Sequence, residues 1–153
     1  MIDVGDTLPD MDLVAADGSA VKLSDYHGKK LVLFFYPKAS TPGCTTESKD
    51  FSALLPEFEK AGAAVLGMSA DSPKRQQNFI TKQELTVDIA SDESTDFLTK
   101  IGVWAEKKMY GKTYMGIIRS TFLIGPDGIV LQAWPKVKVK GHAEDVLAAT
   151  QAA

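Results

Sequence analysis

The segment that most constrains the fold is the continuous apolar run from Leu31 to Tyr36, which a loop rich in proline and glycine follows at once. Apolar side chains at every position, without alternation, indicate a strand that is buried on both faces of a sheet. After the loop, apolar residues from Phe51 to Phe58 recur with the spacing of one helix face. A buried strand, a tight loop and an amphipathic helix in this order indicate an α/β domain.

The ends of this first helix can be placed from its capping signals. Thr41 suits the N-cap position, and Pro42 suits the first helical position, where a missing N–H group costs nothing. Gly62 is expected to end the helix. Pro56 lies inside it and is expected to kink it, because proline removes one backbone hydrogen bond and crowds the preceding turn.

The rest of the chain alternates strand and helix signals. We expect a hairpin or an irregular cap before Gly28, strands at 63–69, 87–90, 121–124 and 129–134, and helices at 73–83, 94–101 and 142–150. The turn sequence at 125–128 should join the last two strands as a hairpin. This order predicts one α/β domain over residues 1–153, a thioredoxin-like three-layer fold with a central mixed sheet and an N-terminal hairpin extension. The alternating lysines 136, 138 and 140 are expected to form the solvent face of a strand.

Composition excludes several classes of function. A net charge of -3 over 153 residues argues against nucleic acid as the main partner. No stretch is long and apolar enough for a membrane span, and the N-terminus carries no secretory signal, so we expect no membrane association. Two histidines and one cysteine, far apart in sequence, predict no metal site. The single cysteine cannot form an internal disulfide, which favours a reducing compartment and a cytoplasmic location.

That single cysteine, Cys44, lies in the expected first turn of the helix after the loop. A helix N-terminus offers unpaired N–H groups and about half a positive charge, and both favour a thiolate over a thiol. Cys44 also precedes Phe51 by seven residues, so that it shares the inward-facing stripe of the helix. The sequence therefore predicts a nucleophilic cysteine rather than an inert one.

The residues around Cys44 resemble those of a known family. The spacing of Pro37, Thr41 and Cys44 matches the peroxide-binding motif of the peroxiredoxins, and residues 35–47 are similar almost throughout to the active-site segment of the bacterioferritin-comigratory (thiol peroxidase Q) group. Arg119 begins a segment that resembles the strand with that family's active-site arginine, and residues 134–143 resemble its C-terminal segment. The resemblance implies a thiol-dependent peroxidase in which Cys44 is oxidised to a sulfenic acid.

Peroxide reduction suggests a role for each neighbour of Cys44. The Thr41 hydroxyl can position the peroxide, and Pro37 can shield the thiolate without offering a competing N–H group. Arg119 can stabilise the thiolate and the departing oxygen, because an arginine entering an apolar strand is costly unless it is paired. Glu47, one turn after Cys44, can orient Arg119 through an ion pair. No metal, flavin or heme is implied.

The sequence departs from the family where many members carry a second, resolving cysteine. The two positions known for it are occupied here by Lys49 and Ile80. An engineered replacement would more often install serine or alanine, so we interpret the chain as a natural one-cysteine protein. An external thiol, either glutathione, glutaredoxin or thioredoxin, must then resolve the sulfenic acid, unless two subunits couple through Cys44. We expect the substrates to be hydrogen peroxide and organic hydroperoxides, and we expect the protein to be a monomer.

Plainer interpretations remain open for the same residues. On these interpretations Cys44 is a packing residue, Thr41 a helix cap, Pro37 a strand terminator and Arg119 half of a structural ion pair, and Glu47 lies on a helix surface. Two other functions also stay open: a peroxide sensor or chaperone-like redox protein, and a thiol-disulfide oxidoreductase. A thiol-disulfide oxidoreductase would need a pair of cysteines, and this chain lacks the pair, because Thr41 stands where the first of the two would be. His142 is expected to belong to a helix cap, and Trp104 and Trp134 to packing or to the entrance of the site.

Overall fold

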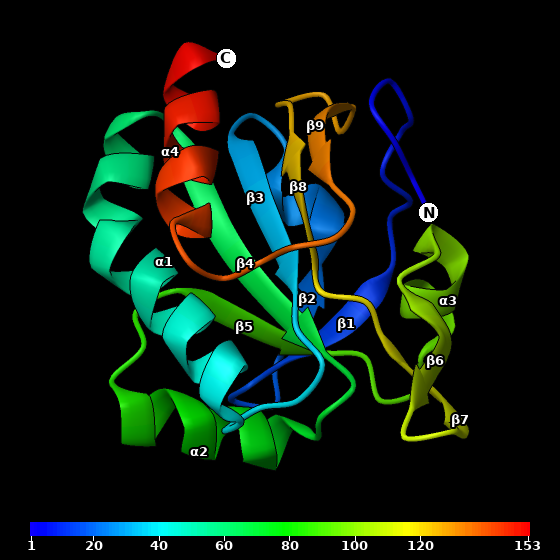
Figure 1. Cartoon of the computed structure of the whole chain (residues 1–153). Helices are drawn as coiled ribbons and strands as arrows, with labels where there is room; N and C mark the ends of the chain where they lie inside the picture. Colours follow the sequence, from blue (N-terminus) through cyan, green and yellow to red (C-terminus); the bar gives the residue numbers. More distant parts are fainter.

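A mixed sheet of seven strands forms the centre of the structure, a computed structural model that describes residues 1–153 (Figure 1). The strands of this sheet are β1 (Asp12–Ala15), β2 (Ala20–Lys22), β3 (Lys30–Phe35), β4 (Ala63–Ser69), β5 (Asp88–Ser91), β8 (Ser120–Ile124) and β9 (Val130–Trp134). They lie in the order β2-β1-β5-β4-β3-β8-β9. The helices are η1 (Leu23–Tyr26), α1 (Pro42–Lys60), α2 (Pro73–Gln83), α3 (Asp96–Ile101) and α4 (His142–Ala152).

The centre of the sheet is parallel and its margins are antiparallel. β3 and β5 both pair with β4 in parallel, whereas β8 and β1 run antiparallel to their neighbours. β1 and β2 form an antiparallel hairpin that joins the sheet through β5. The mixed sheet and the N-terminal hairpin extension predicted from the sequence are therefore both confirmed.

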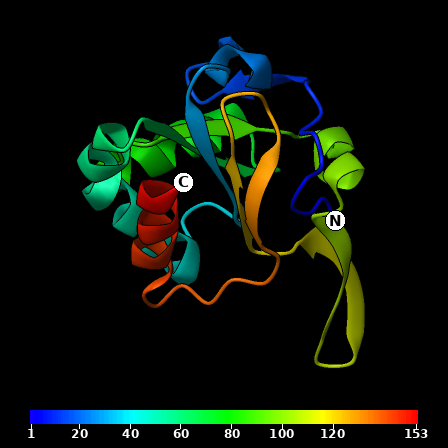
Figure 2. The ribbon, with the colours of Figure 1, turned by 90° about the horizontal axis from the view of Figure 1, so that it is seen from above.

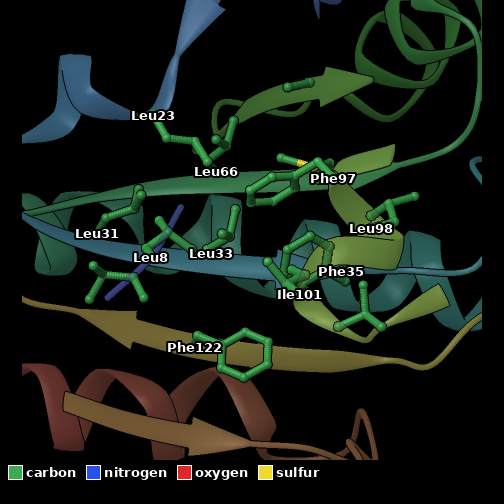
Figure 3. Close-up of a cluster of buried hydrophobic side chains, with 14 of the residues drawn as sticks. Leu8, Leu23, Leu31, Leu33, Phe35, Leu66, Phe97, Leu98, Ile101 and Phe122 are labelled. Carbon is green, nitrogen blue, oxygen red and sulfur yellow. The ribbon is translucent and has the colours of Figure 1, made fainter. Parts of the chain in front are cut away.

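Two buried clusters lie on opposite faces of the sheet, and alternate residues of β3 contribute to each. One cluster gathers apolar side chains of α3, with Phe97 and Leu98 against Leu33 and Phe35 (Figure 3). The other cluster takes in residues of α1, α2 and α4. Because successive side chains of a strand point to opposite faces, an uninterrupted apolar strand requires cover on both sides. Helices above and below the sheet give the three-layer arrangement that the sequence predicts.

The long helix α1 begins and ends where its capping signals place it. Thr41 is its N-cap residue, and Gly62, just beyond its end, has a positive φ of 77°. Pro56 stands inside the helix and has no N–H group for the carbonyl of Ser52, four residues earlier. The hydroxyl of Thr86 donates to that carbonyl instead, at 3.2 Å. The carbonyl that proline leaves free therefore connects α1 to the segment before β5.

A two-stranded sheet that was not predicted is formed by β6 (Trp104–Met109) and β7 (Lys112–Ile117). Its turn residues, Tyr110 and Gly111, both have positive φ, which is the geometry of a two-residue hairpin loop. Glu106, Lys107 and Lys108 stand in succession in β6, so the apolar alternation that marks a half-buried strand is interrupted. Figure 2 shows the hairpin extending away from the central sheet.

Two other expectations need correction. The lysine-rich stretch at 136–140 is not a strand: it forms an irregular crossing between β9 and α4. Its backbone hydrogen bonds run from Val137 N–H to the Arg119 carbonyl and from His142 N–H to the Val139 carbonyl. Alternating lysines fit the wet face of a strand, but these residues have no neighbouring strand to pair with. Helix α3 begins at Asp96, two residues later than expected, because Thr95 takes a left-handed conformation. No helix in the structure has both the length and the apolar composition to span a membrane.

Candidate active site

Cys44 lies at the point where the carboxyl end of β3 meets the N-terminus of α1. It is in the first turn of the helix, and its side chain is completely buried. The buried strand brings the chain to this end of the sheet, and the loop from Tyr36 to Thr41 turns it into the helix. Side chains at the carboxyl ends of parallel strands lie where α/β proteins most often bind ligands.

Arg119 connects Cys44 to Glu47. One terminal nitrogen of its guanidinium, Nη2, lies 3.3 Å from the Cys44 sulfur, and the other, Nη1, lies 2.7 Å from a carboxylate oxygen of Glu47. Arg119 precedes β8, which pairs with β3, so the strand register places it beside the loop. A fixed cation in hydrogen-bond contact with sulfur stabilises negative charge there.

Gly43 makes room for this contact. A β-carbon placed on Gly43 would lie only 3.1 Å from Nη2 of Arg119, closer than side-chain atoms usually come. A larger residue at this position would therefore push the guanidinium away from the sulfur. The glycine before Cys44 is required for close approach of the arginine, whereas its backbone conformation is one that any residue can adopt.

The side chain of Thr41 does not cap the helix, although the residue occupies the N-cap position. Its hydroxyl donates instead to the carbonyl of Lys38, at 2.7 Å. The N–H groups of Gly43 and Cys44 consequently have no hydrogen-bond partner, and the Thr41 oxygen keeps its lone pairs free. The first turn therefore presents two donors and one acceptor beside the sulfur, as a peroxide requires.

Burial dominates the charge state of Glu47. The residue is only 1% exposed, and its Oε2 atom has no hydrogen-bond partner. Burial raises the pKa of Glu47 to about 7, even though the neighbouring Arg119 favours the ionised form. Burial would lower the pKa of Arg119, but the Glu47 carboxylate and the Cys44 sulfur outweigh it, and the arginine pKa is raised. Glu47 is thus not the helix-surface carboxylate of the plainer interpretation.

Pro37 lies two residues after β3 and lines a cavity of about 490 Å³ beside the site. The neighbouring Ser40 has a positive φ of 66°, a backbone conformation that is strained for a residue with a side chain. Strain of this kind persists only where surrounding contacts hold the backbone in place. Surrounding contacts therefore hold the loop between Pro37 and Thr41 in this conformation.

The anchor of this loop is Asp71, which lies just before the start of α2. Its Oδ2 atom accepts the backbone N–H of Ala39 at 2.7 Å and the hydroxyl of Ser69 at 2.7 Å. Asp71 follows β4, so the parallel pairing of β3 and β4 places it beside the loop that follows β3. The parallel pairing of these strands could have identified Asp71, because polar residues at the carboxyl ends of adjacent parallel strands must lie together.

A buried chain of hydrogen bonds extends this anchor into α2. Gln76 donates to the Ser69 hydroxyl at 2.7 Å, and its side-chain oxygen accepts the hydroxyl of Tyr36, the residue that begins the loop. Gln76 and Tyr36 are both fully buried. Because buried polar groups are costly without partners, this network fixes the position of the loop against β4 and α2.

The structure thus brings Cys44, Arg119 and Glu47 into one connected group, with Thr41 and Pro37 in the adjoining loop. His142 lies elsewhere: it is buried, and it hydrogen-bonds the Thr121 hydroxyl at 2.8 Å. Nowhere do three or more histidine, cysteine, aspartate or glutamate side chains lie close enough together to bind a metal ion. Trp104 lines the cavity next to Pro37, as one of its two expected placements predicts.

Known proteins resemble the chain over nearly its whole length. Residues 4–133 match the model of the AhpC/TSA family. Peroxiredoxin Bcp of Xanthomonas campestris pv. campestris is 52% identical over 143 residues, which cover 94% of this chain and 89% of that protein. A structure of the Xanthomonas campestris bacterioferritin comigratory protein, solved in work on alkyl peroxide reduction, superposes with a TM-score of 0.88 at 51% identity, over 93% of this chain and 90% of the other.

A cysteine-to-serine mutant of Xylella fastidiosa PrxQ superposes with a TM-score of 0.94 at 44% identity, over 99% of this chain and 97% of the other. These relatives share the thioredoxin-like fold and the arrangement of the sheet and helices described above. The chain therefore belongs to the AhpC/TSA family, within its Bcp (PrxQ) group of peroxiredoxins, which are thiol peroxidases.

Proposed function

We propose that this protein reduces hydrogen peroxide and organic hydroperoxides through Cys44, and that an external thiol completes each cycle. The observation that carries the proposal is the 3.3 Å contact between Nη2 of Arg119 and the Cys44 sulfur. It joins the only cysteine of the chain to a fixed cation at a helix N-terminus. The structure of the Xanthomonas relative, solved in work on alkyl peroxide reduction, supports organic hydroperoxides as substrates.

In the first step the Cys44 thiolate attacks the terminal oxygen of the peroxide. A sulfur–oxygen bond forms as the oxygen–oxygen bond breaks, Cys44 becomes a sulfenic acid, and the departing alkoxide or hydroxide takes a proton from water. Negative charge moves from the sulfur to the departing oxygen during this step. Arg119 stabilises the charge at both ends, and Glu47 keeps the guanidinium in place through the 2.7 Å ion pair.

The loop and the first turn of α1 hold the peroxide in line for attack. The free N–H groups of Gly43 and Cys44 donate hydrogen bonds to a peroxide oxygen. The Thr41 oxygen accepts a hydrogen bond from the peroxide O–H group, because the Thr41 hydroxyl itself donates to the Lys38 carbonyl. Pro37 shields the sulfur from water on the side of the cavity. Positioning of this kind converts a slow bimolecular encounter into reaction within one complex.

In the second step a thiol from outside the chain attacks the sulfur of the sulfenic acid. The sulfur–oxygen bond breaks, water leaves, and a mixed disulfide forms; a second thiol then releases Cys44 and an external disulfide. Lys49 and Ile80 occupy the two positions of a resolving cysteine, so the chain has no thiol of its own for this step. We propose thioredoxin, glutaredoxin or glutathione as the reductant, a monomeric protein, and the reducing cytoplasm as its compartment.

Mass spectrometry of the intact protein tests the first step directly. One equivalent of hydrogen peroxide should add a single oxygen to the wild-type protein, and added glutathione should convert this product into a glutathione adduct. Cys44→Ser should gain neither mass. A folded wild-type protein whose Cys44 does not react under these conditions contradicts the proposal.

Steady-state turnover separates a peroxidase from a peroxide sensor. With excess thiol, the peroxidase should consume many equivalents of peroxide per protein molecule, whereas a sensor oxidises once and stops. Consumption that ends at one equivalent while free thiol remains would favour the sensor.

A further inference from the structure

We propose that the cavity beside Pro37 binds the resolving reductant, and that this reductant is a small anionic thiol of the glutathione class. The inference rests on the proposed function, because it concerns the second half of the same cycle. Its starting point is the absence of a second cysteine, which obliges an external sulfur to reach Cys44. A cavity of about 490 Å³ adjoins the site and has no assigned occupant.

The walls of this cavity come from the same segments that position the reactive sulfur. Pro37 and Lys38 belong to the loop that leads to Thr41, and Gly116 and Ile117 lie just before Arg119. The third side, at the start of α2, is formed by Ala70, Asp71, Ser72 and Arg75. Cys44 itself is buried, so the thiol sulfur approaches it past Pro37, which belongs to both the cavity wall and the active-site loop.

The cavity is positively charged in a protein whose net charge is -3. Three cationic side chains line it, from Lys38, Arg75 and Lys107, against one carboxylate, that of Asp71. One oxygen of this carboxylate accepts the Ala39 N–H and the Ser69 hydroxyl, and the other lies 3.9 Å from Nη1 of Arg75, so that Lys38 and Lys107 are the two cations without a carboxylate partner. The excess of positive charge favours a ligand with free carboxylates, and glutathione carries two carboxylates and one ammonium group.

The size and the apolar part of the cavity also suit a tripeptide. Pockets for small molecules occupy roughly 300 to 1,000 Å³, and their walls are mostly apolar with a few polar groups that fix orientation. Here Trp104, Tyr114 and Met115 supply apolar surface from the hairpin of β6 and β7. Uncharged thiols of similar size lack the carboxylates that the three cations would bind.

The chemistry of this step balances without another reactant. The thiolate of the bound tripeptide attacks the Cys44 sulfur, the sulfur–oxygen bond breaks, and the oxygen leaves as water after taking a proton. The product is a mixed disulfide, and a second molecule of the same thiol reduces it to the Cys44 thiol and an oxidised dimer of the tripeptide.

Charge-removing variants on the cavity wall test the proposal. Sulfenic acid is first formed on each variant with peroxide, and its second-order reaction with glutathione is then followed. Arg75→Gln and Lys107→Gln should each lower this rate about tenfold, the loss expected for one charge contact near a protein surface. Reaction with uncharged β-mercaptoethanol should change by less than twofold in the same variants.

Lys74→Gln is the matched control, since Lys74 neighbours Arg75 on α2, is exposed and does not line the cavity. Its reaction with glutathione should equal that of the wild type. The proposal is overturned if Arg75→Gln and Lys107→Gln keep the wild-type rate, if Lys74→Gln is slowed equally, or if β-mercaptoethanol is slowed to the same degree. It is also overturned if the variants lose reaction with thioredoxin alone, which indicates a surface for a protein partner.

Failure of the proposed function gives a different result. In that case no sulfenic acid forms on the wild-type protein in the first step, and the comparison of thiols is never reached.

Discussion

Arg119 is the only residue in contact with both the reactive sulfur and a buried carboxylate. Its two terminal nitrogens are used separately, one for Cys44 at 3.3 Å and one for Glu47 at 2.7 Å. This division depends on the planar, forked shape of a guanidinium. Glu47, in turn, has one oxygen in the ion pair and one without any partner.

Arg119→Lys should slow oxidation of Cys44 by hydrogen peroxide about 100-fold, although the charge is kept. A single ammonium cannot contact the sulfur and the carboxylate at once, so the cation is pulled away from the sulfur, and loss of one donor at developing charge has an effect of this size. Stopped-flow measurement of the second-order rate constant checks this expectation. A rate within twofold of wild type would show that the charge alone is sufficient.

Glu47→Gln should remove a pH dependence of stability. Burial raises the pKa of Glu47 from 4.5 to about 7, so between these pH values the folded protein holds a proton that the unfolded chain has released. The contribution of Glu47 to the free energy of unfolding is therefore complete below pH 4.5 and is lost as the pH rises to 7. The wild-type value minus the Glu47→Gln value should fall by on the order of 3 kcal/mol across this range.

Urea unfolding of both proteins at several pH values measures this difference. Because His142 and the other titrating groups are common to the two proteins, their contributions cancel. A difference that stays constant, or one that grows with pH, would contradict the buried state of Glu47.

The sequence was sufficient to name the five candidate residues, but it left one detail open at this scale. Thr41 was placed correctly at the helix N-cap, yet its hydroxyl turns back to Lys38, and no pattern in the sequence distinguishes these two hydrogen bonds. The pairing of Arg119 with Glu47 was predicted because an arginine that enters an apolar strand needs a carboxylate partner. Contacts between residues 72 positions apart follow from the strand pairing of β3 with β8.

At the scale of elements, the active-site loop depends on helix α2 and strand β4. Asp71 and the buried chain through Ser69 and Gln76 attach the loop to both. In this way the strained Ser40 conformation is supported from a part of the chain that touches neither the peroxide nor the sulfur.

Asp71→Ala should slow peroxide oxidation of Cys44 about tenfold and destabilise the protein by about 2 kcal/mol, because it leaves the buried Ala39 N–H without an acceptor. Asp92→Ala is the matched control. Asp92 is also a buried carboxylate that accepts a backbone N–H, that of Leu98, but at the start of α3. It should lose similar stability and keep the wild-type oxidation rate, and equal rates in the two variants would contradict a positioning role for Asp71.

Elements with strong apolar patterns were predicted closely, and those without them were not. The strands β3 and β4 and the helices α1 and α2 lie within about one residue of their expected bounds, since packing and capping signals agree there. The hairpin of β6 and β7 was missed because consecutive charged residues interrupt its apolar alternation, although Tyr110 and Gly111 have the backbone of a two-residue turn.

At the scale of the whole molecule, one lysine joins the central sheet to two helices of the layer that covers one of its faces. Lys30, at the start of β3, donates from Nζ to the carbonyls of Ala61 and Thr150, which lie at the C-terminal ends of α1 and α4. Carbonyls at a helix C-terminus carry partial negative charge and have no partner within the helix. This ammonium, at the start of an interior strand, therefore satisfies carbonyls of two helices.

Lys30→Met should lower the free energy of unfolding by about 1 kcal/mol, because it keeps the aliphatic stem and removes only the ammonium. Urea denaturation measures the change. Lys29→Met is the matched control, because Lys29 is the exposed neighbour without these contacts, and it should change stability by less than half as much. Equal losses in the two variants would contradict a role for the helix ends.

The two tryptophans of the chain lie in different surroundings and give the protein two separate optical signals. Trp104 borders the cavity, whereas Trp134 packs at 5.9 Å from the ring of His142, against α4. A Trp134→Phe protein would report by fluorescence the filling of the cavity, and a Trp104→Phe protein would report changes in the layer that holds Cys44. Oxidation and thiol binding can thus be followed separately, in real time, without attaching a dye.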